Sequence, residues 1–413
     1  MSSRSRPSGC GRPAGPSPGE ANPDRVPFPL DPSKVDGNPA GYARLREERP
    51  VCPVVLPAGQ HAWLVTRYAD ARLVLSDSRF SKAALTRPDA TRIHPGTLLP
   101  GLLLTTDPPE HTALRAPLTR LMAVRETVRH RPRIRAAADD VLDAFTAGPK
   151  PADLVTGFAG PLATRVICEQ LGLPVTPDAR FTAWAETVLG GFDRPAHEVN
   201  RALGDLLGYV AEVVAGKRAN PAGDLLSSLA TSQFAPGDEA MVKLGATLLV
   251  TGIETMTAVV SKAVLALLTR SSGLPVLPAA PGARHLLIEE VLRFATVGET
   301  VRSRRALEDV RLGDVVIGRG DIVLVAIGSA NQDEAEFPAA AEFDPGRQPN
   351  RHLAFGHGVH FCVGAPLARL ELDVALERLS VRLPKLRLAS SADRVRARVG
   401  SAEIPPAVLP VLW

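Results

Sequence analysis

Cys362 is the residue with the clearest capacity for chemistry, and it lies in the glycine-rich segment 352–372. A cysteine thiolate is a soft ligand that suits iron. The helix expected after Cys362 would direct its N-terminal dipole at the sulfur and favour the thiolate. Glycines at this density suit a loop that adopts positive φ or approaches a flat ligand closely. A lone cysteine in an apolar segment is usually a buried core residue, so its surroundings must decide between the two interpretations.

The residues around Cys362 form a spaced motif. It reads Phe355-Gly356-x-Gly358-x-His360-x-Cys362-x-Gly364. This motif resembles the haem-binding loop of the cytochrome P450 family. The resemblance implies that Cys362 is the proximal ligand of a haem b iron and that His360 bonds a haem propionate. It also implies that Phe355, Gly356 and Gly364 contact the cofactor.

Glu254 and Thr255 form a second candidate site in an apolar segment, where Glu254 is the only acid within 241–270. Such a carboxylate must reach solvent, find a partner or serve a proton relay. The segment resembles the oxygen-binding helix of the same family, in which Glu254 and Thr255 would be the catalytic acid and alcohol that deliver protons to bound O2. The sequence departs from the family's usual residues at three positions, Thr251, Ile253 and Met256.

Glu290 and Arg293 are three residues apart on one face of a predicted helix. Taken alone, this spacing is common and describes an exposed pair worth a few tenths of a kcal/mol. The resemblance implies instead a buried structural lock before the cysteine loop, with Arg347 as its third member. We therefore expect these residues to serve folding rather than catalysis.

His111 and Arg115 are four residues apart and share a helix face in the segment 107–115. Histidine and arginine side chains usually lie at least partly exposed at the surface. The resemblance implies that both hold haem propionates, with Arg304 as the matching cation from a later strand. Arg302 is a close rival for that role, because the spacing does not separate the two.

Composition limits the classes of function. The 413 residues are 45% hydrophobic and carry a net charge of +4, with no Lys/Arg run interleaved with aromatics, which argues against nucleic-acid binding. The four cysteines are far apart, as in proteins of a reducing compartment. Residues 1–24 lack the apolar core of a signal peptide or anchor, so we expect a disordered extension. Charges interrupt the apolar run 241–270, so we expect no membrane span and a cytoplasmic location.

The patterning predicts mainly helices with a smaller β portion, an α+β class. Helices are expected at 41–47, 69–76, through most of 109–270, and at 363–379. Short strands are expected at 61–66, within 308–327 and in the C-terminal tail. The resemblance implies the cytochrome P450 fold, a triangular helical prism around haem, with residues 25–413 as a single catalytic domain.

The family resemblance also implies a reaction. The expected function is a haem-thiolate monooxygenase that inserts one atom of O2 into a small-to-medium apolar substrate by hydroxylation or epoxidation, as a step in polyketide, macrolide or other secondary-metabolite biosynthesis. Electrons would come from NAD(P)H through a separate ferredoxin or flavodoxin and its reductase, and the protein would be a monomer. Two alternatives remain at this stage: oxidative coupling or ring formation without oxygen insertion, and a haem-based sensor or carrier.

Overall fold

The computed structural model of the protein covers most of the chain. It describes residues 25–28, 30, 35, 40–56, 59–93, 96, 98–174, 179–190, 194–232, 236–270, 273–297, 302–398, 401 and 403–413. The expected disordered extension 1–24 lies outside the described residues.

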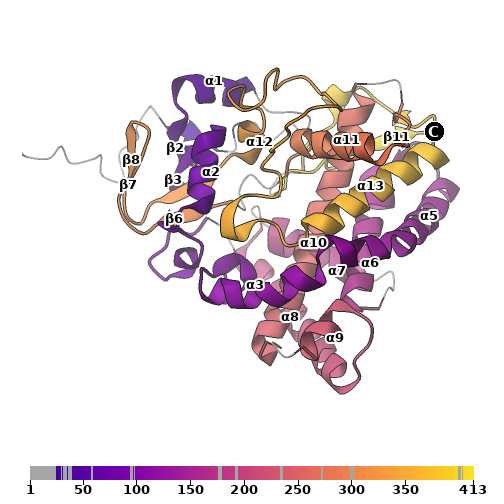
Figure 1. The fold of residues 1–413 in the computed structure, drawn as a ribbon, viewed down its shortest axis with the longest axis horizontal. Helices are drawn as coiled ribbons and strands as arrows, with labels where there is room; N and C mark the ends of the chain where they lie inside the picture. Colours follow the sequence, from indigo (N-terminus) through magenta and orange to yellow (C-terminus); the bar gives the residue numbers. More distant parts are fainter. Residues whose placement is uncertain are drawn as a thin grey trace, which may run out of the picture.

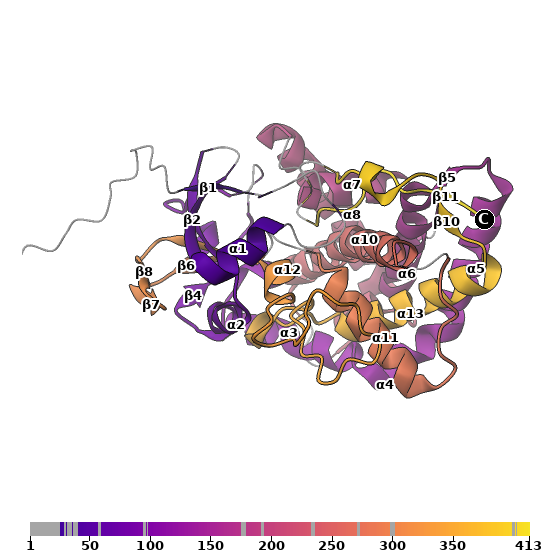
Figure 2. The same cartoon turned by 90° about the horizontal axis from the view of Figure 1, so that it is seen from above.

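Helices make up the larger part of the described chain, as predicted, and most of them lie away from the large sheet, which α1 and α2 accompany (Figures 1 and 2). Their bounds are α1 Ala40–Glu48, α2 Tyr68–Ser76, α3 Glu110–Leu121, α4 Val124–Thr127, α5 Arg131–Ala147, α6 Gly160–Leu171, α7 Ala179–Gly190, α8 Ala196–Ala219, α9 Leu225–Ala230, α10 Asp238–Leu268, α11 Pro281–Phe294, α12 Ile327–Ala330 and α13 Ala365–Arg382.

The strands form three small sheets within the described residues. The largest has the order β1-β2-β3-β9-β6-β4 and lies with α1 and α2 at the end of the molecule away from the C-terminus (Figure 1). Its strands are β1 Val26–Pro27, β2 Val51–Val55, β3 His61–Val65, β9 Ile322–Val325, β6 Arg304–Ala306 and β4 Phe80–Ser81. The smaller sheets are β10-β11-β5 (Arg387–Leu388, Pro410–Leu412 and Ala152–Asp153) and β7-β8 (Val310–Leu312 and Val315–Ile317).

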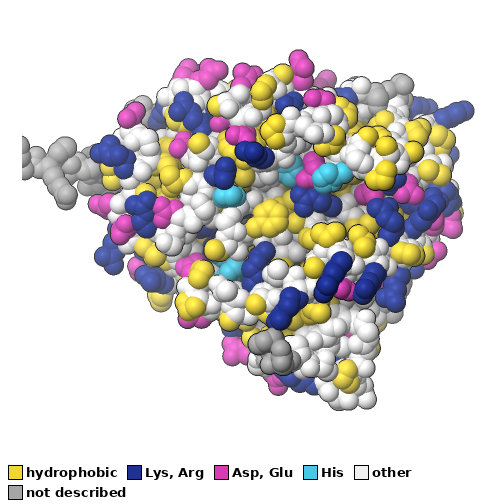
Figure 3. All heavy atoms as spheres, viewed as in Figure 1, with side chains coloured by type: hydrophobic (Ala, Val, Ile, Leu, Met, Phe, Trp, Pro, Cys, Tyr) yellow, Lys and Arg dark blue, Asp and Glu magenta, His cyan; other side chains and the backbone are white. Residues whose placement is uncertain are grey.

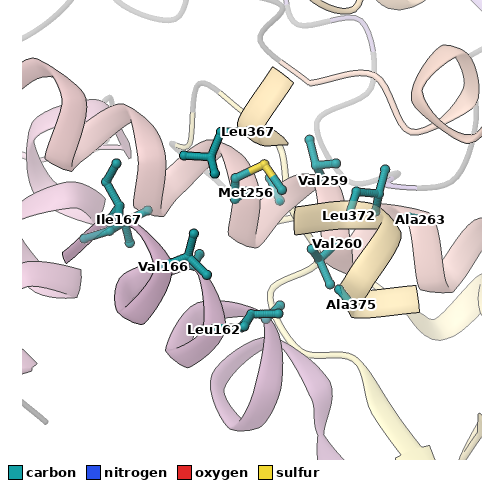
Figure 4. Packing of buried hydrophobic residues seen from close by; sticks show 14 of the residues in the cluster. Leu162, Val166, Ile167, Met256, Val259, Val260, Ala263, Leu367, Leu372 and Ala375 are labelled. Carbon is teal, nitrogen blue, oxygen red and sulfur yellow. The ribbon is translucent and has the colours of Figure 1, made fainter. Parts of the chain in front are cut away.

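Helix α10 runs through the centre of the helical region, and its buried positions cover nearly all faces in its C-terminal half. Figure 4 shows side chains of α10 between those of α6 and α13, with Val259 and Ala263 near Leu372 of α13. The close contact with α6 depends on Gly252, because a Cβ there would lie 2.7 Å from Cγ1 of Ile167. A helix that is apolar on most sides must be buried on most sides, so α10 forms the core.

Helix α10 differs from the expectation that its charged residues would disqualify the run 241–270 as a candidate membrane span. Among the described residues it is the one helix long and apolar enough to cross a bilayer, despite its charged residues. In the most apolar 18-residue stretch of this helix, 78% is buried inside the protein, as expected for a core helix rather than a lipid-facing one.

Most of the predicted elements are confirmed. The helices expected at 41–47 and 363–379 are α1 and α13, and the strands expected within 308–327 are β7, β8 and β9. The long irregular segment between β4 and α3 contains only short 3₁₀ turns among its described residues. These elements bring α10, the start of α3 and the cysteine loop around one cavity.

Candidate active site

One large cavity brings together residues from α10, α3, the cysteine loop and the start of α13. It encloses up to about 1420 Å³, part of which is open to solvent. Cys362 and Thr255 both line it, so the two sites predicted from separate motifs belong to one space.

The loop before α13 presents Cys362 to this cavity. The Cys362 amide donates to the Phe355 carbonyl at 2.8 Å and closes the loop, and the Gly364 N–H donates to the sulfur. The pKa of the Cys362 thiol is nevertheless raised, because burial outweighs the nearby cations, chiefly Arg302, and the Gly364 N–H. Arg302 and the Gly364 N–H thus favour the thiolate, and a bound metal would stabilise it further.

Gly358 shows why this loop needs glycine. It has φ of +70°, and a Cβ there would lie 2.7 Å from the Leu75 carbonyl oxygen of α2. We expect Gly358→Ala to lower stability by at least about 1–2 kcal/mol, the cost of left-handed backbone for alanine, before the overlap is counted. Thermal unfolding would measure this loss. Gly204→Ala on α8, where a Cβ meets nothing, should be neutral or stabilising. Equal melting temperatures for the two variants would contradict this account of the loop.

A cluster of cationic and protonatable side chains borders the same cavity. His111, Arg115, Arg302 and His360 all line it, and the rings of His111 and His360 lie 4.3 Å apart. His111 Nε2 and Arg302 Nε are buried and lack a hydrogen-bond partner among the described residues. Burial and the neighbouring His360 and Arg115 lower the pKa of His111 to about 4. Buried polar groups are normally paired, so this cluster fits an anionic ligand that would satisfy them.

Arg304 lies on the first strand after α11, where it was expected, but its side chain is enclosed by the protein. It lies in β6, is 2% exposed and is not among the residues that line the cavity, whereas its rival Arg302 is. Burial and the charge of Arg302 lower the pKa of Arg304 to about 10. Of the two candidate cations, Arg302 lines the cavity, and Arg304 lies close enough to His111 and His360 for its charge to lower the pKa of each.

Asp107 organises the edge of this cluster and was not singled out from the sequence. Its carboxylate accepts from the Ser81 hydroxyl at 2.5 Å and from the Lys82 amide at 3.0 Å, and it lies 3.9 Å from His360 Nε2. Although burial opposes ionisation, these hydrogen bonds hold the pKa of Asp107 well below its usual range. Lys82 is buried beside Arg304 and Arg302, and burial together with these cations lowers its pKa strongly. The concentration of buried positive charge again indicates an anionic ligand.

Thr255 and Glu254 are adjacent on α10 but face different surroundings. Thr255 lines the cavity, and its hydroxyl donates to the Thr251 carbonyl at 2.6 Å. Glu254 is 1% exposed and does not line the cavity. Its carboxylate pairs with Arg398 and accepts from the Ser401 hydroxyl at 3.0 Å. Of the three possibilities that the sequence left open for Glu254, the structure places it with a partner.

Glu290, Arg293 and Arg347 are brought together and fully enclosed. Arg293 donates to both carboxylate oxygens of Glu290 at 2.7 and 2.8 Å, and neither side chain is exposed. Arg347 Nε lies 3.2 Å from the same carboxylate. The two guanidinium groups also donate to carbonyls of the segment that precedes the cysteine loop, namely those of Asn331, Pro338, Ala339, Ala340 and Glu342.

Two further carboxyl groups line the cavity and were missed from the sequence. Glu371 of α13 and Glu403 near the C-terminus are each 2% exposed, and each has one oxygen without a partner among the described residues. Burial raises the pKa of Glu371 to about 8 and that of Glu403 to about 7. Glu371 could have been suspected as an acid in an apolar helix, but no motif marked Glu403.

These residues fit a haem. The sulfur of Cys362 is a soft ligand for iron, and the glycine loop permits close approach of a flat porphyrin. The buried nitrogens of His111 and Arg302, which lack a partner among the described residues, suit the anionic propionates. Among the described residues, no group of three or more His, Cys, Asp or Glu could hold a metal ion by side chains alone.

The comparisons with known proteins agree with this geometry. The cytochrome P450 family model matches residues 285–382. The chain is 40% identical to a mycinamicin IV hydroxylase/epoxidase from Micromonospora griseorubida, over 90% of this chain and 94% of that protein. It is also 40% identical to a nocardicin C N-oxygenase from Nocardia uniformis subsp. tsuyamanensis, over 93% and 97% of the two chains.

Solved structures extend the agreement to the fold. The crystal structure of SgvP, a putative thioether synthase of griseoviridin tailoring, matches with a TM-score of 0.87 and 36% identity, over 94% of this chain and all of that one. A structure of MycG, a mixed-function P450, in complex with mycinamicin IV matches with a TM-score of 0.83 and 39% identity, over 94% and 100% of the two chains. With this similarity along nearly the whole chain, the protein belongs to the cytochrome P450 family and is a P450 monooxygenase with the fold of that family.

Proposed function

We propose that the protein inserts one oxygen atom from O2 into a small-to-medium apolar substrate, by hydroxylation or epoxidation, as a tailoring step in secondary-metabolite biosynthesis. The observation that carries this proposal is that Cys362 and Thr255 line one cavity from separate elements. The rest of that cavity is largely apolar, with side chains such as Leu103, Ile167 and Val297. Relatives that act as a macrolide hydroxylase/epoxidase and as an N-oxygenase support an antibiotic-type substrate. We further propose that residues 25–413 form one catalytic domain.

The haem would be held by residues of the cysteine loop and the cationic cluster. Cys362 would be the iron ligand, with Phe355 beside it and Gly356 and Gly364 allowing close approach. His111, Arg115, Arg302 and His360 would bind the propionates, with Arg304 as a second layer of positive charge. When bound, a thiolate-ligated haem supplies O2 activation and the oxidation of the substrate.

The chain itself would supply the protons through Glu254 and Thr255. Exposure falls from Glu186, whose side chain is 41% exposed, through Arg398 at 25% to Glu254 at 2%. Arg398 contacts both carboxylates, at 2.8 Å for Glu186. A proton could therefore pass from solvent to Glu254 when this pair opens, and from there to the Thr255 hydroxyl in the cavity.

Thr255→Ala should uncouple electron use from product formation. Without the hydroxyl, the cavity loses the polar group that would hold a proton near the reacting oxygen, so productive proton transfer slows and we expect the share of electrons released as hydrogen peroxide to rise several-fold. Peroxide and product would be measured against NAD(P)H consumed.

Thr257→Ala is the matched control for this prediction. Thr257 is on the same helix and makes the same kind of bond, to the Ile253 carbonyl at 2.7 Å, but it does not line the cavity. Coupling should therefore be unchanged in this variant. Equal coupling in Thr255→Ala and the wild type would remove Thr255 from the proton path.

A separate ferredoxin or flavodoxin would deliver the electrons from NAD(P)H through its reductase. Figure 3 shows Lys and Arg side chains gathered over α3, α5 and α13, on the face that also carries the cysteine loop in Figure 1. Arg125 of α4 and Arg129, which precedes α5, are largely exposed, and so in part are Val359 and Phe361, next to Cys362. A basic face with an apolar centre suits an acidic electron-transfer protein, and we place the protein in the cytoplasm with these partners.

Oxidative coupling without oxygen insertion is the second candidate reaction. It is favoured by the similarity to SgvP, a putative thioether synthase, and to P450mel, described as having biaryl coupling reactivity. Turnover of a macrolide and peptide-antibiotic panel under ¹⁸O2, with NAD(P)H and a surrogate ferredoxin system, would separate the two. One ¹⁸O atom in the product supports insertion, and a product that lost hydrogen without gaining ¹⁸O supports coupling. Haem without NAD(P)H-dependent turnover of any compound would favour the sensor or carrier function instead.

A further inference from the structure

Glu403 enters the cavity from a hairpin that no motif marked. The hairpin is closed by backbone bonds from Arg398 N to the Pro405 carbonyl and from Ala407 N to the Arg396 carbonyl, both at 2.8 Å. Glu403 lies two residues before Pro405 and lines the cavity together with α10 residues such as Thr251 and Thr255. Its side chain is 2% exposed, and Oε2 has no partner among the described residues.

The charges around Glu403 are unbalanced. Glu254 raises its pKa, as burial does, while Arg302 and Lys262 oppose these effects. Arg398 is shared between Glu254 and Glu186, and Lys262 Nζ donates to the Thr296 carbonyl at 2.6 Å. Of the cations that act on Glu403, Arg302 would bind a haem propionate and Lys262 already donates to a backbone carbonyl, while Glu254 adds negative charge. The region then lacks positive charge.

The buried Glu403 carboxyl group, with one oxygen unpartnered among the described residues, has no evident role in stabilising the fold. A buried carboxyl group with an unpartnered oxygen costs free energy, and an apolar side chain in its place would cost less. Glu290 shows the contrast, because every partner of that carboxylate is supplied by the chain itself. The partner of Glu403 is therefore expected to come from outside the chain, by way of the cavity.

We propose that Glu403 is a substrate-anchoring carboxylate that binds a basic nitrogen, so that the enzyme prefers substrates carrying a protonated amine. The inference rests on the proposed function, because it takes this cavity as the substrate site of a haem enzyme. An amine cation would pair with the Glu403 carboxylate and offset the negative charge that Glu254 adds beside it. The apolar side chains of α10 and of the segment before α3 would hold the carbon skeleton.

Two probes of equal shape test the proposal on the haem-loaded full chain. One is a decyl chain ending in a trimethylammonium group, and the other is the same chain ending in a neutral tert-butyl group. The quaternary nitrogen has no lone pair and cannot bind the iron, so any preference reflects the protein. Binding would be followed by calorimetry and by the shift of the haem absorption band. At pH 8 we expect the cation to bind at least about tenfold more tightly than the neutral probe.

Glu403→Gln should abolish this preference, because the amide keeps the shape but loses the charge. Glu403→Asp should keep part of it. Glu198→Gln, which removes an exposed carboxylate of α8 outside the cavity lining, should leave it unchanged. Because Glu403 is largely protonated below its raised pKa, the wild-type preference should also shrink as the pH falls from about 8 to 6.

Two further measurements distinguish a failure of the amine-anchoring role from a failure of the proposed function. The carbon monoxide spectrum of each variant reports haem and thiolate ligation, and the melting temperature of Glu403→Gln should equal or exceed that of the wild type. If these are normal but the wild type binds both probes equally, or binds neither, the amine-anchoring role is overturned. A preference that survives in Glu403→Gln would overturn it as well. A preference that disappears only in Glu403→Gln supports it.

Discussion

Cys362→Ser is expected to abolish monooxygenase turnover. Serine keeps the size of the side chain and can still accept from the Gly364 N–H, so the loop and the cavity should remain. It removes the soft, electron-donating sulfur on which cleavage of the O–O bond depends. We expect the turnover number to fall at least about a thousandfold, which corresponds to about 4 kcal/mol in the barrier. NAD(P)H-dependent product formation with a surrogate ferredoxin system would measure it.

Cys168→Ala provides the control for this prediction. Cys168 is buried in α6, 1% exposed, and does not line the cavity. Its removal should cost some stability, as for any buried side chain, but should leave turnover intact. A Cys362→Ser variant that retained more than about a tenth of the wild-type rate would place the metal ligand elsewhere.

Arg293→Ala should produce the largest loss of stability. The guanidinium donates to both oxygens of Glu290 and to the carbonyls of Asn331, Ala340 and Glu342. Its removal leaves a buried carboxylate short of charge and three carbonyls without this donor. Breaking a buried pair from one side costs about 3–5 kcal/mol, a large part of the roughly 5–15 kcal/mol that stabilises a typical domain. Urea unfolding followed by circular dichroism would measure the change.

The same experiment has an internal reference in Arg44→Ala. Arg44 pairs with Glu48 one turn away on α1, and both side chains are more than half exposed. Such a pair contributes about 0.3–0.5 kcal/mol. Arg293→Lys should also be strongly destabilising, because a lysine cannot replace the planar fork that contacts Glu290 at two points. If Arg293→Ala unfolds at the same urea concentration as Arg44→Ala, the proposed lock before the cysteine loop is wrong.

The parts of the site that could be predicted from the sequence are those set by local spacing. The glycines around Cys362 are determined by backbone geometry within ten residues, and Gly358 indeed has positive φ. Glu290 and Arg293 meet because three residues separate them on α11. The apolar run of α10 likewise required burial, and Gly252 sits where α6 approaches.

The remaining parts depend on contacts between distant segments. Glu254 and Arg398 are 144 residues apart, and nothing near Glu254 in the sequence indicates that its partner comes from a C-terminal hairpin. Glu403 reaches the cavity only because that hairpin folds back over α10. Arg302 lies in the turn before β6 and lines the cavity, whereas Arg304 is the first residue of β6 and does not, a difference that the spacing left open.

The most direct test of the central claim is the absorption spectrum of the dithionite-reduced protein with carbon monoxide. We predict a strongly red-shifted Soret band, as expected for haem with thiolate ligation by Cys362, and its loss in Cys362→Ser. A protein that binds haem without this shift would contradict thiolate ligation and the oxygen chemistry derived from it. A folded protein that takes up no haem when haem is supplied would contradict the assignment of the cavity itself.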